Sequence, residues 1–202
     1  MNNKQKVSVL GGGSFGTVLA NLAASNGSNV ALWVRDSEQA LRINSEGANS
    51  TYHPELKLSE NIMASEDLFE VVKNADLIFV ATPSKIFEKI IIRISKIIKE
   101  ECYVISCTKG ILDDPFRTMT DIILSNNIKH FGVLSGPNLA KEIAENKVTG
   151  TVIASNDQQM ITSVKEVLSS VTFKIYSSND IQGVELAGAM KNIYAITCGL
   201  AE

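Results

Sequence analysis

The sequence predicts an α/β fold built on a doubly wound, mostly parallel sheet with helices on both faces. Short apolar runs of strand length alternate along the chain with longer amphipathic stretches, an alternation typical of this class. A cluster of glycines directly follows the first apolar run, where a strand must turn sharply into a helix. With 202 residues, of which 45% are hydrophobic, the chain is long enough to bury a full core.

The first predicted element is a strand over residues 6–10, followed by a glycine turn and an amphipathic helix. Gly11 makes the turn, and Gly13 lets backbone amides approach a pyrophosphate at the positive end of the helix. Gly16 allows the helix to pack closely on the strand. A G-x-G-x-x-G pattern in this context predicts a Rossmann-like fold that binds a dinucleotide, although such a turn also has purely structural uses.

A second strand, residues 29–34, ends in Arg35 and Asp36 at the spacing where such folds contact the adenosine ribose. Arg35 would pair with the 2′-phosphate of NADP, whereas Asp36 would accept hydrogen bonds from the ribose diol of NAD. We therefore expect NADP or NAD as the cofactor. The alternative is that the two residues form a solvated pair at the end of a strand.

The alternation of strands and helices continues through the middle of the chain. The expected bounds are 62–64 (strand), 66–74 (helix), 76–81 (strand), 86–98 (helix), 103–107 (strand) and 131–135 (strand). The last two strands deliver Lys109, Gly136 and Asn138 to their carboxyl ends, where open α/β sheets place ligands. The alternatives are that Lys109 is an exposed loop residue and that Asn138 is a turn residue.

A late helix, residues 185–196, carries a single lysine among small and apolar residues. Helical periodicity places Lys191 on one face with Val184, Ala187, Gly188, Ala195 and Cys198. A lysine on such a face is tolerated when it is paired or when it works as an acid or base. The alternative is a lysine that snorkels to water at a helix boundary.

Composition narrows the range of partners and compartments. The formal net charge of -3 gives no sign of a nucleic-acid partner, and no long apolar run suggests a signal peptide or a membrane span. We therefore expect a cytoplasmic protein. Cys102, Cys107 and Cys198 are odd in number and lie within apolar stretches, which favours buried thiols over a disulfide or metal framework. The two histidines, His53 and His130, give no zinc motif, so no metal site is predicted.

Four segments together resemble the NAD(P)-dependent glycerol-3-phosphate dehydrogenases of the bacterial type. They are residues 11–16, 107–111, 134–142 and 185–193, and they occur in the expected order across nearly the whole chain. Each segment alone could arise elsewhere, but all four at these spacings are specific. The resemblance implies hydride transfer between NAD(P) and the substrate, which interconverts sn-glycerol 3-phosphate and dihydroxyacetone phosphate for glycerophospholipid synthesis.

The resemblance also implies a role for each matching residue. The implied cofactor-binding residues are Gly11, Gly13, Ser14, Phe15, Gly16, Arg35, Lys109 and Ala140, with Ser14 and Phe15 at the pyrophosphate and Ala140 near the nicotinamide. The implied substrate-binding residues are Lys109, Gly136, Asn138, Lys191 and Asn192. Lys191 would be the catalytic acid or base. Lys109 would stabilise the developing alkoxide, and its repulsion would ease the release of a proton from Lys191.

The sequence departs from the family at its end. Family members continue into an all-helical domain that completes the substrate site with an Asp and an Arg-Asn pair. We therefore expect a dinucleotide-binding domain over residues 1–182 and the start of a helical substrate domain over 183–202, in a fragment of a longer enzyme that is a homodimer at full length. The helix bearing Lys191 is apolar nearly all round, so it predicts a partner surface.

Three other functions compete with this interpretation. A related dehydrogenase acting on another small acid would share the glycine turn and the late lysine helix, but not residues 108–110 together with 135–138. A dinucleotide sensor would bind the cofactor without turnover. A structural subunit would have no use for two lysines placed at a ligand-binding edge. A turnover assay with dihydroxyacetone phosphate separates the first two from a glycerol-3-phosphate dehydrogenase.

Overall fold

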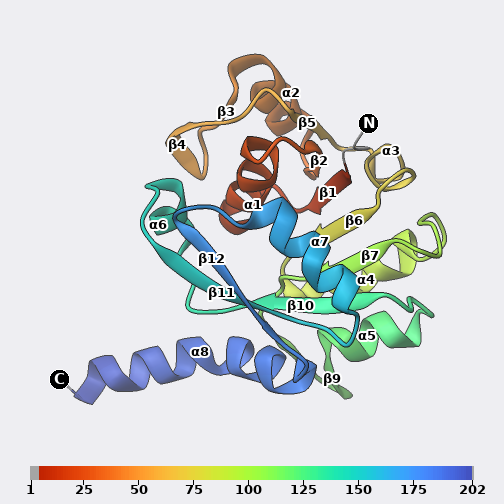
Figure 1. Cartoon of the computed structure of the whole chain (residues 1–202), viewed down its shortest axis with the longest axis vertical. Coiled ribbons are helices and arrows are strands. Elements are labelled where there is room, and N and C mark those ends of the chain that lie inside the picture. The colour runs from red at the N-terminus through yellow and green to blue at the C-terminus, as the bar shows by residue number, and fades with distance from the viewer. Residues whose placement is uncertain (1–4, 202) are drawn as a thin grey trace.

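The computed structural model describes residues 5–201, which are organised around one large sheet (Figure 1). Its strand order over these residues is β12-β11-β10-β7-β6-β1-β2-β5. The strands are β1 (Lys6–Leu10), β2 (Asn29–Trp33), β5 (Ile62–Ser65), β6 (Leu77–Val80), β7 (Tyr103–Ser106), β10 (Phe131–Ser135), β11 (Thr149–Ala154) and β12 (Phe173–Ser178). Two small hairpins stand apart from it, namely β3 (Ala48–Asn49) with β4 (His53–Lys57) and β8 (Ile111–Asp113) with β9 (Phe116–Thr118).

The predicted doubly wound, mostly parallel topology is confirmed. β1 lies at the middle, the chain first builds outward through β2 and β5, and it then returns to build through β6 and β7 on the other side. Every pairing in the large sheet is parallel except that of β10 with β11. The order therefore reverses between β1 and β6, which is the place where such sheets open a crevice for ligands.

Helices cover both faces of the sheet and create two separate apolar cores. They are α1 (Ser14–Ser25), α2 (Ser37–Glu46), α3 (Leu68–Val72), α4 (Ser84–Ile94), α5 (Met119–Ser125), α6 (Ala140–Ala144), α7 (Gln158–Leu168) and α8 (Ile181–Ala201). Successive residues of β6 point to opposite faces: Phe79 joins the core under α1 and α7, and Ile78 joins the core under α4 and α5. Burial on both faces explains why the strands read as continuous apolar runs.

Several predicted boundaries shift by one or more residues, and at α3 a side-chain cap is the reason. The helix expected over 66–74 begins only at Leu68, since the Asp67 side chain accepts hydrogen bonds from the backbone of Phe69 and Glu70. The second strand ends at Trp33, one residue earlier than expected. The α1 helix ends at Ser25, and Gly27 follows with a φ of 92° that suits glycine.

The cysteine prediction is correct for two residues and wrong for the third. Cys102 and Cys107 are buried, and burial raises the pKa of the Cys102 thiol to about 12. Cys198, however, is exposed on α8. The reason is that α8 packs only through its first turns and then projects from the body of the molecule, as Figure 1 shows.

Within residues 5–201, no helix combines the length and the hydropathy that a membrane crossing requires.

Candidate cofactor and substrate site

The glycine turn between β1 and α1 contains the three glycines of the G-x-G-x-x-G pattern. Two of them, Gly11 and Gly16, leave no space for a side chain, whereas Gly13 does. Gly11 has a φ of 121°, and its N–H donates to the Trp33 carbonyl at 3.0 Å. A methyl group on Gly16 would lie 1.9 Å from the Gly11 carbonyl oxygen, so only glycine fits. A methyl group on Gly13 would meet nothing within 4 Å. Free space beside Gly13 at a helix N-terminus suits the pyrophosphate of a dinucleotide.

Side chains that are distant in sequence hold this turn in place. The Gln39 and Asn49 side-chain amides donate to the Gly12 carbonyl at 2.7 and 3.0 Å. Thr17 Oγ1 donates to the Gly13 carbonyl at 2.8 Å. Sequence reasoning missed Gln39 and Asn49, because nothing in the local pattern indicates that they reach a loop 27 and 37 residues away. The turn is consequently preorganised by the protein itself.

A cavity of about 330 Å³ extends from the turn over the carboxyl ends of β1, β2 and β6. Arg35 lines it as expected, and Arg42 of α2 and Tyr52 of the β3–β4 loop line it as well. Asp36 lines the cavity too, and its carboxylate also accepts a hydrogen bond from the Glu38 backbone at 3.0 Å and so caps α2. Arg35 and Arg42 outnumber the Asp36 carboxylate, so this end of the cavity is positively charged.

The loop after β7 brings Lys109 to the same edge of the sheet. Its ammonium donates to the Gly136 carbonyl at 3.1 Å, which joins two of the predicted substrate residues. Burial lowers the pKa of Lys109, and the positive charge of nearby Lys191 lowers it further. The two lysines therefore lie close enough for their charges to interact, and Lys109 is half-buried rather than an exposed loop residue.

Thr108 connects the lysine loop to the cofactor cavity. Its hydroxyl donates to the Thr82 carbonyl at 2.8 Å, and Thr82 lines the cavity beside Gly11. The next residue, Gly110, must be small, because a methyl group there would lie 2.7 Å from Cβ of Ser84 at the start of α4. The lysine loop and the glycine turn thus face one crevice.

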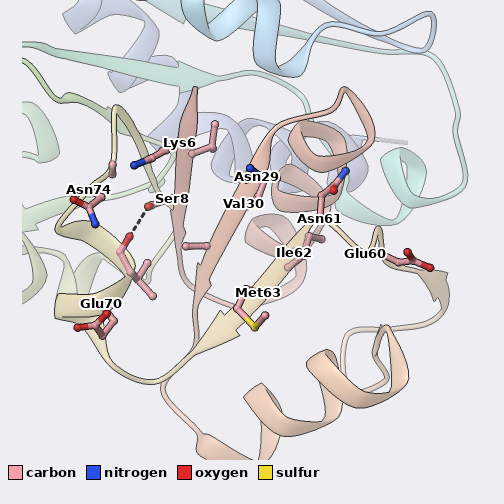
Figure 2. Close-up of a pocket in the computed structure, with 14 residues that line it drawn as sticks. Lys6, Ser8, Asn29, Val30, Glu60, Asn61, Ile62, Met63, Glu70 and Asn74 are labelled. Carbon is pink, nitrogen blue, oxygen red and sulfur yellow. Dashed lines mark hydrogen bonds between the residues drawn. The ribbon is translucent and has the colours of Figure 1, made fainter. Parts of the chain in front are cut away.

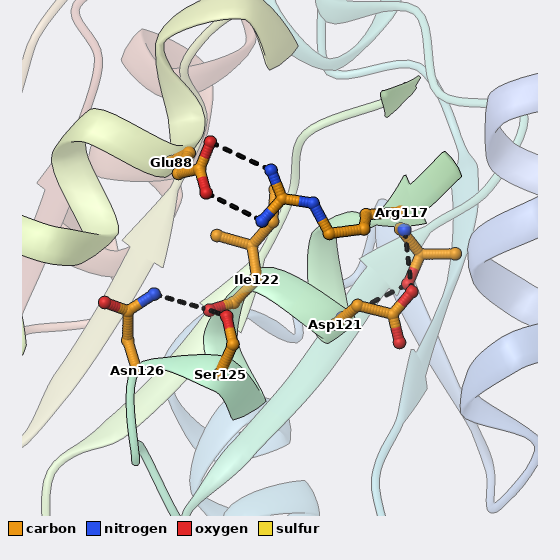
Figure 3. A network of polar contacts seen from close by, with 7 residues as sticks. Glu88, Arg117, Asp121, Ile122, Ser125 and Asn126 are labelled. Atoms are coloured by element: carbon orange, nitrogen blue, oxygen red, sulfur yellow. Dashed lines mark hydrogen bonds and ion pairs between the residues drawn. The ribbon is translucent and has the colours of Figure 1, made fainter. Parts of the chain in front are cut away.

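A network of polar contacts anchors the hairpin that follows this loop (Figure 3). Arg117 of β9 donates two hydrogen bonds to the Glu88 carboxylate of α4, at 2.7 and 3.1 Å. This guanidinium holds the pKa of Glu88 below its ordinary value. Thr118 and Asp121 form a reciprocal capping box that starts α5. The chain leaving Lys109 is consequently fixed between α4 and α5.

Asn138 is buried and oriented by β11. Its side-chain amide donates to Thr151 Oγ1 at 2.9 Å, and Thr151 Oγ1 donates to the Ser135 carbonyl at 3.1 Å. Asn138 Oδ1 and Ser135 Oγ are buried without a hydrogen-bond partner among residues 5–201. An unpaired acceptor beside Gly136 is suited to a hydroxyl group of a ligand.

The first turns of α8 are fastened to the body of the molecule. The buried Glu185 carboxylate accepts hydrogen bonds from the backbone N–H and the hydroxyl of Thr120. Gly188 packs on Ser135 so closely that a methyl group would lie 2.1 Å from its Oγ. These two contacts set the position of Lys191, whereas the neighbouring Asn192 is exposed.

The remaining predicted residues open the helices that flank the crevice. Ser14 and Phe15 begin α1, and Ala140 begins α6, which packs against α1. Sequence reasoning missed His53, whose Nε2 lies 3.0 Å from Ser14 Oγ.

A second cavity, of about 430 Å³, lies at the opposite edge of the sheet (Figure 2). It is formed at the amino ends of β1, β2 and β5, and Ser8 Oγ donates to the Val71 carbonyl at 2.6 Å on its wall. It is larger than the cavity at the glycine turn. Because open α/β sheets bind ligands at the carboxyl ends of their strands, we assign the site to the smaller cavity.

The glycine turn, the parallel sheet and the lysines at its carboxyl edge define a dinucleotide-binding α/β domain of the dehydrogenase class. The family model for the N-terminus of NAD-dependent glycerol-3-phosphate dehydrogenase matches residues 6–161. The chain belongs to this family, as the sequence predicted.

Known relatives agree with this assignment. The chain is 47% identical over 200 residues to glycerol-3-phosphate dehydrogenase [NAD(P)+] of Alcanivorax borkumensis, covering 98% of the chain and 58% of the relative. It is 44% identical to the enzyme of the same name from Teredinibacter turnerae, covering 100% of the chain and 59% of the relative. The crystal structure of glycerol-3-phosphate dehydrogenase from Coxiella burnetii matches with a TM-score of 0.91 at 33% identity, covering 98% of the chain and 61% of that structure. The chain thus spans less than two thirds of each relative.

Proposed function

We propose that this chain supplies the cofactor site and both lysines of an NAD(P)-dependent glycerol-3-phosphate dehydrogenase. The observation that carries the proposal is the place of Lys109 at the carboxyl edge of the sheet, where its ammonium bonds to the Gly136 carbonyl and is close enough to Lys191 for their charges to interact. Thr108 links this pair to the wall of the cofactor cavity. A substrate that carries both a phosphate and a reacting carbinol group needs such a pair of cations beside a dinucleotide.

Each lysine has a distinct task in the proposed reaction. When bound, the nicotinamide exchanges a hydride with C2 of the substrate. Lys191 delivers a proton to the C2 oxygen or removes one from it, because it stands on a small-residue helix face fixed by Glu185 and Gly188. Lys109 stabilises the charge that develops on that oxygen. The product in the reducing direction, glycerol 3-phosphate, is a precursor for glycerophospholipid synthesis.

The proposed binding residues are those that the family resemblance implies. We assign the pyrophosphate to the turn containing Gly11, Gly13 and Gly16, with Ser14 and Phe15 beside it, and the adenosine end to Arg35. Ala140 serves the nicotinamide half. Gly136, Asn138 and Asn192 join the lysines around the substrate, and the unpaired Oδ1 of Asn138 supports this assignment. Arg35 and Arg42 in one cavity make NADP an acceptable cofactor alongside NAD.

The apolar surface of α8 supports the proposed domain organisation. Residues 1–182 form the dinucleotide-binding domain, and 183–202 begin a helical substrate domain. Large apolar side chains of α8 are exposed, namely Leu186, Met190, Ile193, Tyr194, Ile196 and Leu200. Exposed apolar surface of this kind is typical of an interface, so further helices cover it in the whole enzyme. We also propose that the enzyme is a cytoplasmic homodimer.

Cofactor titration tests the proposed binding site on this chain. At Gly13 the Cβ of a valine would meet nothing within 4 Å, so we expect the fold to persist in Gly13→Val while the side chain fills the pyrophosphate space. We expect the parent to bind NADH and NADPH in a fluorescence titration and Gly13→Val to lose both. Gly199→Val is the matched control, because a methyl group at Gly199 also meets nothing within 4 Å. Equal binding by the Gly13→Val chain would contradict the site.

Turnover tests the rest of the proposal. The longest polypeptide that the reading frame encodes should oxidise NADH or NADPH with dihydroxyacetone phosphate. Cofactor binding without any turnover by that polypeptide would favour a dinucleotide sensor.

A further inference from the structure

The β3–β4 hairpin places a buried histidine against the start of α1. His53, the first residue of β4, is 7% exposed and lies 39 residues from Ser14 in the sequence. Its Nε2 is 3.0 Å from Ser14 Oγ and 2.9 Å from the Ser14 carbonyl oxygen. Asn49 of β3 holds the Gly12 carbonyl, so the same hairpin holds the turn at two points.

The contact with the carbonyl determines where the protons lie. A carbonyl oxygen only accepts, so His53 Nε2 must carry a proton in order to bond to it. Ser14 Oγ, which lies at a similar distance from the same nitrogen, is then a second acceptor for that proton. The hydroxyl proton of Ser14 is consequently left free to bond to another group.

We propose that His53 is a positioning residue for the cofactor, which fixes Ser14 as a hydrogen-bond donor to the dinucleotide pyrophosphate. The inference rests on the proposed function, because it requires the pyrophosphate to lie at the glycine turn. The space beside Gly13 lies next to Ser14 in the chain, and a phosphate oxygen there is a strong acceptor for the free hydroxyl proton. Fixing the hydroxyl before binding removes an entropic cost of ordering it.

Two substitutions separate the donor from the bulk of the imidazole. His53→Leu keeps an apolar side chain of similar size and removes the donor. His53→Gln offers an amide N–H at a similar reach. We expect His53→Leu to weaken NADH and NADPH by the same factor, about tenfold, since a hydrogen bond that involves a charged group is worth roughly one such factor. We expect His53→Gln to recover most of this loss.

A double-mutant cycle distinguishes positioning from a general structural role. In a Ser14→Ala chain, which has no hydroxyl to orient, the factor by which His53→Leu weakens NADH binding should be at least about threefold smaller than in the parent. His130→Gln, at a histidine that directly precedes the amino end of β10 and contacts Asp157, is the control and should bind as the parent does. Circular dichroism and thermal melts check that each variant is folded.

These measurements distinguish a failure of the proposed His53 role from a failure of the proposed cofactor site. Equal loss from His53→Leu with and without the Ser14 hydroxyl, or no loss at all, would overturn the role of His53 while leaving the cofactor site intact. A folded parent that binds neither NADH nor NADPH would overturn both this inference and the proposed function.

Discussion

The glycine turn and helix α8 differ in where their stabilising partners come from. The turn is held by Thr17, Gln39, Asn49 and His53, none of which lies beyond residue 53 of the chain. Helix α8 is fastened through its first turns, at Glu185 and Gly188. Beyond these turns its side chains are exposed, including Ile193, Tyr194 and Ile196 at 61%, 60% and 65%. The glycine turn is therefore held by contacts within the described residues, whereas most of α8 is exposed there.

Lys191 lies between the anchored first turns of α8 and its exposed remainder. The turn before it is anchored to β10 through Gly188, and the turn after it faces solvent. Binding and turnover should consequently respond to different substitutions. The following predictions test that separation, from the largest expected effect to the smallest.

Removal of the Lys191 ammonium should have the largest effect. Lys191→Ala should lower the rate of dihydroxyacetone phosphate reduction at least about a hundredfold, because loss of a positioned acid or base costs ~10²–10⁴ in rate. NADH affinity, measured by titration, should stay near that of the parent, since the glycine turn is untouched. Lys191→Arg should restore little, because a guanidinium stays charged and does not release its proton near neutral pH.

A Lys191→Ala enzyme that retains most of its turnover would move the acid or base role to Lys109 or to another group. Loss of NADH binding in the same variant would show that α8 and the glycine turn are coupled, which contradicts the separation drawn above.

Glu185 should matter for the stability of the α8 anchor and little for cofactor binding. Glu185→Ala leaves the buried backbone N–H of Thr120 without its acceptor, which costs about 1–3 kcal/mol in the free energy of unfolding. Urea unfolding measures this loss. Glu185→Gln keeps one acceptor oxygen and should lose less. An unchanged free energy of unfolding in Glu185→Ala would mean that α8 is not held through this contact.

Substitution of Arg35 should change the ratio of NADPH affinity to NADH affinity, by a smaller factor than Lys191→Ala changes the rate. Arg35→Ala should weaken NADPH about tenfold more than NADH, because only NADPH carries a 2′-phosphate for the guanidinium to pair with. Arg93→Ala, on the exposed side of α4, removes the same charge away from the cavity and should leave the ratio unchanged. Equal weakening of NADPH and NADH by Arg35→Ala would reduce Arg35 to a general surface charge.

The fold was predictable from the sequence because its signals are local. Gly11 and Gly16 are demanded by the backbone of one turn, and the strands are apolar because both faces of the sheet are covered. The β11 and β12 strands and the two hairpins were not anticipated. They carry weaker apolar patterns, and half-exposed strands such as β12 depend on their neighbours for definition.

The site was predictable only where a motif carries it. Lys109 and Gly136 follow strands and meet as expected. Asp36 shows the limit, because an acidic residue at a strand end can serve a ribose, a helix cap or both, and the local sequence did not indicate the cap that the structure shows. His53 reaches Ser14 across 39 residues through a hairpin, and no local periodicity encodes a contact of that range.

The smallest effect on stability is expected on the exposed part of α8. Ile196→Lys should change the free energy of unfolding of this chain by no more than about 0.5 kcal/mol, because the side chain is 65% exposed and loses no packing partner. Leu19→Ala, in the core beneath α1, is the contrasting substitution and should cost about 2–5 kcal/mol, since Leu19 is fully buried. Sedimentation should also show less self-association in Ile196→Lys, because a charge interrupts the apolar face. If Ile196→Lys lowered the free energy of unfolding nearly as much as Leu19→Ala, α8 would have to pack along its whole length. The contrast between the glycine turn and α8 would then be wrong.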